Sequence, residues 1–174
     1  PAMREGLNHT LTDYRLLAES SGRKFTLQVN EGDFVEGAVR SLYAGKRLAY
    51  THAILNPPYK KIATASTHRL LLRRAGIETV NLYTAFVALA LELLAHGGEL
   101  VAILPRSFCN GPYYRPFREH VFQNAELRAM HLFASRDRAF KEEGVLQENV
   151  IMHLVRGGTQ GDVRVTTSRD DTFA

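Results

Sequence analysis

The chain has 174 residues, enough for one domain with a single hydrophobic core. Its content of 45% apolar and 23% charged residues is typical of a globular protein and excludes a disordered or collagen-like chain. The net charge of +4 permits a polyanionic partner without requiring one, and the single cysteine, Cys109, excludes an internal disulfide and a cysteine-rich zinc site.

The sequence carries no signal for a membrane or for secretion. Its longest apolar stretch, residues 86–94, is interrupted by Glu92 and is too short to span a bilayer. No basic segment followed by an apolar one opens the chain. We therefore expect a cytoplasmic protein with no membrane partner. Pro1 suits the first position of a helix, so we also expect this chain to be a piece of a longer protein.

The first part of the chain predicts two helices and a strand. Residues 1–20 repeat apolar side chains at helical spacing, and Gly22 suits a left-handed helix end. Residues 25–29 alternate apolar and polar side chains, as strands do. A second helix is expected over residues 34–43, closed by Gly45.

The middle of the chain predicts a strand, a polar segment and a helix. Residues 51–55 form a short, mostly apolar strand that runs directly into Asn56. Residues 60–79 are polar and basic, with little strand or core character. The clearest helix covers residues 81–94, and the glycines of 96–98 end it.

The C-terminal part continues the alternation of helices and strands. Residues 100–104 predict a buried strand, which Pro105 stops. The remaining expected elements are a loop at 106–116, a helix at 117–122, a strand at 127–133, a loop at 135–147, a strand at 149–155, and a short strand or tail at 163–167.

Short apolar strands that alternate with helices are typical of an open α/β sheet with helices on both faces. In such sheets, ligands bind beyond the carboxyl ends of the strands. Asp33 and Asn56 each follow a predicted strand. We therefore expect both polar side chains at the functional edge of the sheet.

The segment Asn56-Pro57-Pro58-Tyr59 has the properties of a binding turn. Two consecutive prolines fix φ at both positions and favour an extended residue before them, so the turn is stiff. The Asn56 side chain and the carbonyls of Asn56 and Pro57 are acceptors suited to an NH₂ group, and Tyr59 adds a flat ring. A flat substrate with an exocyclic amine fits this arrangement, although a plain strand–turn junction is the alternative.

This turn resembles the catalytic motif of adenine-N6-specific DNA methyltransferases of the Eco57I-like restriction–modification type. The resemblance covers most of the chain, and its further segments are Gly32-Asp33-Phe34, residues 81–86, Gly97-Gly98, residues 101–105, and Phe140 before residues 147–151. It implies a Rossmann-like class I fold that binds S-adenosylmethionine. Residues 1–158 would be the central and C-terminal part of the catalytic domain, and 159–174 a terminal strand or tail.

The resemblance also implies residue roles. Asn56, Pro57, Pro58 and Tyr59 would be catalytic, and the Asn56 side chain and the Pro57 carbonyl would bind the adenine amine. Asp33, Phe34, Pro58 and Phe86 would bind the cofactor, while Tyr59 and Phe140 would stack on an adenine extruded from double-stranded DNA. Asp33 is also suited to capping a helix, Phe86 to the core, and Tyr83 more to the core than to the cofactor.

Basic residues follow the turn closely and are candidates for contacts with the DNA backbone. They are Lys60, Lys61, His68, Arg69, Arg73 and Arg74, and a solvated surface is the alternative for each. Arg115, also a candidate for the DNA backbone, forms a second candidate surface with Arg106, Arg118, Tyr113 and Tyr114. The histidines show no metal-binding spacing, so no metal is expected.

The resemblance implies further parts and leaves alternatives open. A glycine-rich cofactor loop and an acidic ribose-binding residue are expected before Pro1, and a target-recognition domain after the chain. A restriction nuclease is a possible partner. The alternatives are methylation of a protein glutamine or an RNA base, and a DNA-binding fragment without catalysis.

Overall fold

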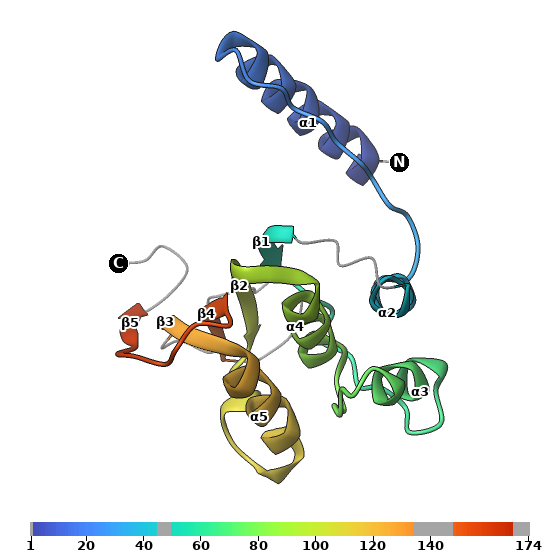
Figure 1. Ribbon diagram of the computed structural model, residues 1–174, viewed down its shortest axis with the longest axis vertical. Coiled ribbons are helices and arrows are strands. Elements are labelled where there is room, and N and C mark those ends of the chain that lie inside the picture. Colours follow the sequence, from blue (N-terminus) through green and yellow to red (C-terminus); the bar gives the residue numbers. More distant parts are fainter. Residues whose placement is uncertain (1, 45–49, 134–147, 169–174) are drawn as a thin grey trace. The chain divides into compact units, whose positions relative to one another are not determined.

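The structure is a computed structural model that describes residues 2–44, 50–133 and 148–168. The chain forms two compact units, Pro1–Gly32 and Asp33–Ala174. Figure 1 shows the helices and strands of both units. None of the described helices is both long enough and apolar enough to cross a membrane.

The first unit contains one helix, α1 (Ala2–Ser20), as predicted. Gly22 follows it with a φ of 65°, the left-handed conformation expected there. The prediction of a strand over residues 25–29 is wrong, because this stretch has no regular secondary structure. A strand needs hydrogen bonds to a neighbouring strand, and none of the described strands pairs with this one. The alternation of apolar and polar side chains alone is therefore not enough to make this segment a strand.

The second unit is built on a five-stranded sheet of order β1-β2-β4-β3-β5. The strands are β1 (Tyr50–Leu55), β2 (Leu94–Pro105), β3 (Ala125–Phe133), β4 (Asn149–Arg156) and β5 (Arg164–Ser168). The pairs β1–β2 and β3–β5 are parallel, while β4 is antiparallel to both of its neighbours. The segment left open as a strand or a tail is thus a strand, paired with β3.

The described residues of this unit also form four helices and two short 3₁₀ turns. The helices are α2 (Phe34–Tyr43), α3 (Thr67–Arg74), α4 (Leu82–Leu93) and α5 (Arg115–Asn124), and the turns are η1 (Arg106–Cys109) and η2 (Pro112–Tyr114). The expectation that residues 60–79 lack core character is wrong. Helix α3 lies within them, and its Leu72 is fully buried. A short helix with a single buried leucine gives only a weak apolar period.

Helix α4 lies between two apolar clusters, which explains why most of its residues are buried. Tyr83, Val87 and Leu91 pack into the cluster formed with β2, β4 and α5. Ala85 and Leu89 pack with α2 and α3 instead. The helix therefore holds both groups of elements in one unit.

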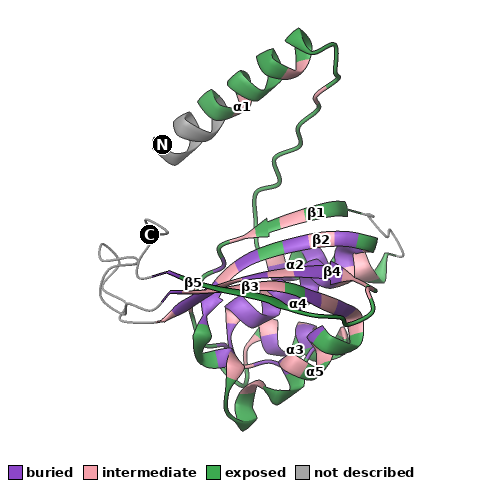
Figure 2. Ribbon diagram, turned by 90° about the vertical axis from the view of Figure 1, so that its left-hand side faces the viewer, coloured by how far each residue is buried: buried purple, intermediate pink, exposed green. Residues whose placement is uncertain are grey.

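The helices of this unit cover one face of the sheet (Figure 2). On that face Leu100, Ala102 and Leu154 are almost completely buried. On the other face Ile54 is 86% exposed and its neighbour Val101 is 37% exposed. One of the two helical layers that the α/β pattern predicts is thus formed by the described residues of this unit.

The parallel strands β1 and β2 place the segments that follow them side by side. Leu55, the last residue of β1, pairs with Ala102 near the end of β2. β3 runs in the same direction as β2, because β4 is antiparallel to both. The carboxyl ends of these three strands therefore share one edge, the expected position of a ligand site in such sheets.

Candidate active site

The turn Asn56-Pro57-Pro58-Tyr59 follows β1 at the carboxyl edge of the sheet. Asn56 and Pro58 are exposed, whereas Pro57 is buried and Tyr59 is half-buried. The Tyr59 ring meets the Tyr83 ring edge-on, with centroids 6.1 Å apart and planes at 81°. The turn is thus anchored by Pro57 and Tyr59, while the Asn56 side chain faces solvent.

The residues after the turn are hydrogen-bonded to the start of α4. The Ile62 amide donates to the Val80 carbonyl and the Leu82 amide to the Lys60 carbonyl, and both N···O distances are 2.8 Å. An isolated antiparallel bridge joins Lys61 and Asn81 between these bonds. A short ladder therefore fixes the turn against α4.

Asn81 extends this frame to the η2 turn. It occupies the N-cap position of α4, but its side chain makes no capping bond. Instead its Nδ2 donates to the Tyr114 hydroxyl at 2.8 Å. The sequence segment 81–86 indicated a helix start, but no local signal pointed to a partner 33 residues away.

Tyr83 lies beneath the turn as a core residue, as the sequence predicted. It is 3% exposed, and its hydroxyl lies 3.0 Å from the Ser107 hydroxyl. Burial raises the pKa of Tyr83 well above its usual value, so the ring stays neutral. A second ring, that of Tyr114, lies 6.1 Å from it. The three tyrosines 59, 83 and 114 thus form a continuous support from the Asn56 turn to η2.

Asp33 caps the N-terminus of α2, the alternative role that its sequence context allowed. Its Oδ1 accepts from the Glu36 amide at 3.0 Å, and its Oδ2 lies 2.8 Å from His68 Nε2 on α3. Burial alone would raise the pKa of Asp33, but the Glu36 amide and His68 outweigh it and lower that pKa. The carboxyl group is therefore held as a charged acceptor. The contact with His68 was not predicted.

Two of the predicted cofactor residues lie together beside Asp33. The rings of Phe34 and Phe86 are 4.6 Å apart and tilted by 37°. Phe86 packs with the apolar cluster of α2 and α3, whereas Tyr83, three residues before it on α4, belongs to the cluster on the sheet. An acceptor carboxylate next to an aromatic pair fits an adenine ring with an amino group, so these residues suit that part of S-adenosylmethionine. Pro58 belongs instead to the turn whose Tyr59 ring meets Tyr83.

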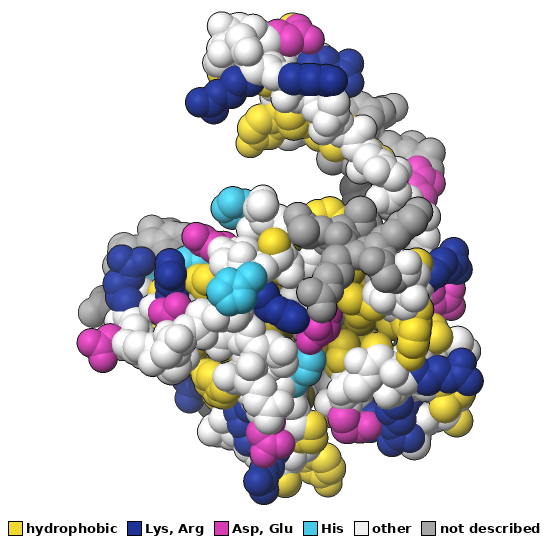
Figure 3. Space-filling model, in the orientation of Figure 1, with side chains coloured by type: hydrophobic (Ala, Val, Ile, Leu, Met, Phe, Trp, Pro, Cys, Tyr) yellow, Lys and Arg dark blue, Asp and Glu magenta, His cyan; other side chains and the backbone are white. Residues whose placement is uncertain are grey.

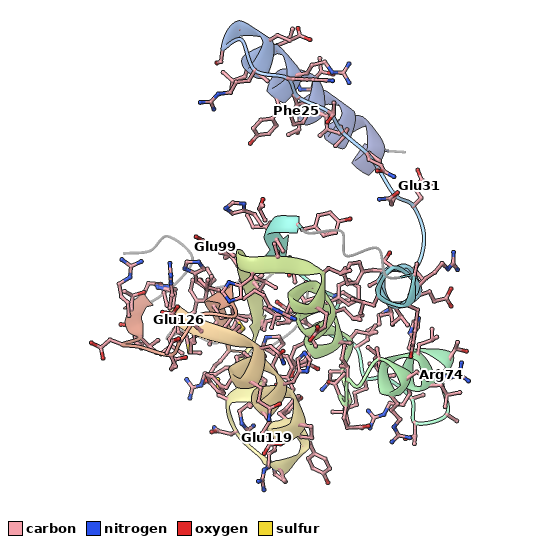
Figure 4. All side chains as sticks on the ribbon, in the orientation of Figure 1. Phe25, Glu31, Arg74, Glu99, Glu119 and Glu126 are labelled. Carbon is pink, nitrogen blue, oxygen red and sulfur yellow. The ribbon has the colours of Figure 1, made fainter. Side chains whose placement is uncertain are left out.

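The predicted backbone-contact residues fall into two groups. Lys60, Lys61, Arg73, Arg74 and Arg115 are exposed, and Lys and Arg side chains gather over α3 and at the start of α5 (Figure 3). Arg73 is paired with Glu78, and Arg115 with Glu119. Arg74 extends from α3 into solvent, as Figure 4 shows.

Arg69 is the exception, and its placement argues against the predicted phosphate contact. It is 8% exposed, and its guanidinium donates to the Thr79 carbonyl and to the Glu78 carboxylate. The buried Arg69 guanidinium therefore holds Glu78 and Thr79, which follow α3, against that helix. A basic residue in a polar stretch gave no indication that it would be buried.

Phe140 lies outside the described residues, so its predicted stacking on the target base stays a prediction. The sequence pointed to His68 and Asn81 but not to their partners Asp33 and Tyr114, and it did not point to Ser107, which lies beside the Tyr83 hydroxyl. Each of these partners is distant in sequence.

Comparison with known proteins identifies the family of the chain. A family model described as Eco57I restriction-modification methylase matches residues 11–140. The type II methyltransferase M.BsuBI of Bacillus subtilis is 56% identical over 153 residues, which cover 84% of this chain and 30% of that protein. The chain thus spans less than a third of the length of this curated relative.

Solved structures show the same fold at low sequence identity. A chain from the type I restriction–modification system superposes with a TM-score of 0.64 at 11% identity, covering 82% of this chain and 28% of that one. A Listeria monocytogenes protein assigned to the class I S-adenosylmethionine-dependent methyltransferases gives 0.53 at 9% identity, over 68% of this chain and 36% of that one. The predicted α/β fold of this class is thereby confirmed.

Proposed function

Because the chain belongs to the Eco57I restriction–modification methylase family, we propose that its protein transfers a methyl group from S-adenosylmethionine to the N6 amino group of adenine in DNA. The observation that carries this proposal is the Asn56-Pro57-Pro58-Tyr59 turn at the carboxyl edge of the sheet. It combines the exposed amide of Asn56 with the Tyr59 ring, which Tyr83 contacts edge-on. The relative M.BsuBI is named a type II methyltransferase, in line with this activity.

In this proposal the turn binds and orients the adenine amine. The Asn56 side-chain oxygen and the Pro57 carbonyl accept its two hydrogens, which directs the nitrogen lone pair out of the ring plane. Tyr59 stacks on the extruded base, and Tyr83 holds the Tyr59 ring in place. The chain contributes orientation more than proton transfer, because a fixed near-attack geometry removes much of the entropic barrier.

Asp33, Phe34 and Phe86 are proposed to hold the adenine end of the cofactor, with Pro58 lining the same site. Asp33 accepts from the amino group, and the two rings contact the flat face. When bound, S-adenosylmethionine supplies an electrophilic methyl group on a sulfonium. The lowered pKa of Asp33 supports this role, since a charged carboxylate is the stronger acceptor.

The exposed basic residues are proposed to contact phosphates on either side of the extruded nucleotide. Lys60 and Lys61 follow the turn directly, and Arg74 lies on α3. Arg73 and Arg115 form surface ion pairs, which contribute little to stability and exchange readily for a phosphate. These contacts would increase affinity without choosing the sequence. A recognition domain and a cognate restriction nuclease are the proposed partners.

Asn56→Ala in the full-length protein tests the proposal. We expect methyl transfer to adenine in duplex DNA to fall by about 100-fold or more, because the amine loses one of its two oriented acceptors. Cofactor affinity, measured by titration calorimetry, should stay unchanged. Mass spectrometry of the digested DNA identifies the methylated base.

Asn124→Ala is the matched control, since Asn124 ends α5 directly before the amino end of β3, at the edge of the sheet opposite the turn. It should transfer methyl groups like the wild type. Undiminished transfer by Asn56→Ala would contradict the assignment of the turn. Methylcytosine in place of N6-methyladenine would contradict the choice of base.

A further inference from the structure

One exposed aromatic ring at the carboxyl edge has no role in the site described above. Tyr113 in η2 is 76% exposed, more than any other aromatic residue in the part of the chain that the structure describes. A large ring left in water contributes nothing to folding, because burial is what stabilises it. Such a residue is therefore a candidate for contact with a partner.

The backbone around Tyr113 is held firmly. The Arg118 guanidinium donates to the carbonyls of Phe108, Asn110 and Gly111, with N···O distances of 2.9, 3.3 and 3.1 Å. Gly111 has a φ of 80°, a conformation that side-chain-bearing residues rarely adopt, and Pro112 follows it at the start of the turn. The exposed ring is thus displayed on a fixed turn.

This turn is connected to the proposed catalytic turn through a few contacts. The residue after Tyr113 is Tyr114, whose hydroxyl accepts from Asn81, and Asn81 pairs with Lys61 just beyond the Asn56 turn. The two segments also leave neighbouring parallel strands at the same edge. Tyr113 therefore keeps a defined position relative to the turn that would receive the base.

The charge next to Tyr113 suits a nucleic acid. Arg115 has a side chain that is 74% exposed, and its partner Glu119 lies one helical turn away on α5. Such a surface pair is weak and can give way to a phosphate. An aromatic ring beside an exposed arginine is the combination with which proteins bind unstacked bases and the adjoining backbone.

We propose that Tyr113 stacks on the DNA bases beside the extruded adenine, with Arg115 on the adjoining phosphate. This rests on the proposed function, in which the target base leaves the duplex. Extrusion breaks stacking on both sides of the base, at a cost of a few kcal/mol. An aromatic ring already positioned beside the space that the base leaves would stack on the neighbouring bases and replace part of the lost stacking. Tyr113 is thereby distinct from Tyr59, which contacts the extruded base itself.

The test uses the full-length protein and duplex DNA with 2-aminopurine at the target adenine. Tyr113→Ala should weaken DNA binding by about 5- to 100-fold and reduce the fluorescence rise that reports extrusion. Tyr113→Phe keeps the ring and should behave like the wild type. Arg115→Ala should reduce the slope of log affinity against log salt concentration by about one, because one phosphate contact is lost. Tyr113→Ala should leave this slope unchanged.

Tyr43→Ala is the matched control, because Tyr43 is a 64% exposed tyrosine at the end of α2, before the amino end of β1. It should not change binding or extrusion. If Tyr113→Ala binds and extrudes like an active wild type, this inference alone is overturned. If Tyr113→Ala instead lowers the melting temperature and cofactor affinity, the ring packs within the longer protein and the inference is also wrong. A wild type that methylates no adenine overturns the proposed function together with this inference.

Discussion

At the scale of single residues, His120 on α5 shows how burial sets a charge state. Its Nε2 lies 3.3 Å from Glu92 Oε1 without forming a hydrogen bond, and Glu92 also pairs with Arg156. Burial lowers the pKa of His120; Glu92 opposes this effect and Arg156 reinforces it. The folded state therefore favours the neutral imidazole.

This lowered pKa predicts a loss of stability in mild acid. Below the ordinary histidine pKa of about 6.5, the unfolded chain takes up a proton that the folded chain does not, so the free energy of unfolding falls. One such group changes it by at most about 1.4 kcal/mol per pH unit. Urea unfolding at pH 7.5 and pH 5.5 should show a smaller loss in His120→Gln than in the wild type. His52 is exposed, so His52→Gln is the control and should lose as much unfolding free energy as the wild type. An equal loss in the wild type and both variants would contradict this account.

At the scale of elements, two glycines differ in how much space their surroundings leave for a side chain. At Gly98 in β2 an added Cβ would lie 2.9 Å from the Ala95 carbonyl oxygen and 3.2 Å from those of Tyr50 and Thr51. All three are backbone atoms, so the β1–β2 junction would have to shift. Gly37 within α2 has no atom within 4 Å of an added Cβ.

We therefore expect opposite effects from the same substitution. Gly98→Ala should lower the free energy of unfolding by about 1–3 kcal/mol, because the strand junction is overpacked. Gly37→Ala should raise it by about 0.5–1 kcal/mol, because alanine restricts the unfolded chain and suits a helix interior. Chemical denaturation measures both. Equal effects of the two changes would show that local packing around Gly98 does not matter.

At the scale of the whole molecule, both apolar clusters lie within the second unit. Their buried members run from Val35 to Leu154, and Asp33 finds its partners Glu36 and His68 in the same unit. Residues 23–32, by contrast, are mostly exposed and form neither helix nor strand. The second unit thus contains the contacts that a cooperative fold needs.

A chain that starts at Asp33 should therefore unfold cooperatively on heating. Loss of residues 1–32 should cost less than about 1 kcal/mol, which corresponds to a fall of less than about 4 °C in melting temperature. Calorimetry of the whole and shortened chains gives the comparison. A broad transition, or a much larger fall, would mean that the first unit completes the core of the second.

Much of the fold was predictable because it follows from local patterns. The helices at residues 34–43 and 81–94 and the strands at 51–55 and 149–155 were placed within one or two residues of α2, α4, β1 and β4. Helix α3 was missed because its apolar period is short. The strand expected over 25–29 was wrong because a strand depends on a partner outside its own segment.

The sequence by itself determined the Asn56 turn, since two prolines restrict the backbone whatever surrounds them. It also determined the alternation of elements that defines the fold class. Only the tertiary structure decided that Arg69 is buried, that His68 faces Asp33, and that Asn81 joins Tyr114. The last two pairs are 35 and 33 residues apart in sequence. Torsional preferences act over a few residues, whereas such pairs exist only once the path of the whole chain has brought them together.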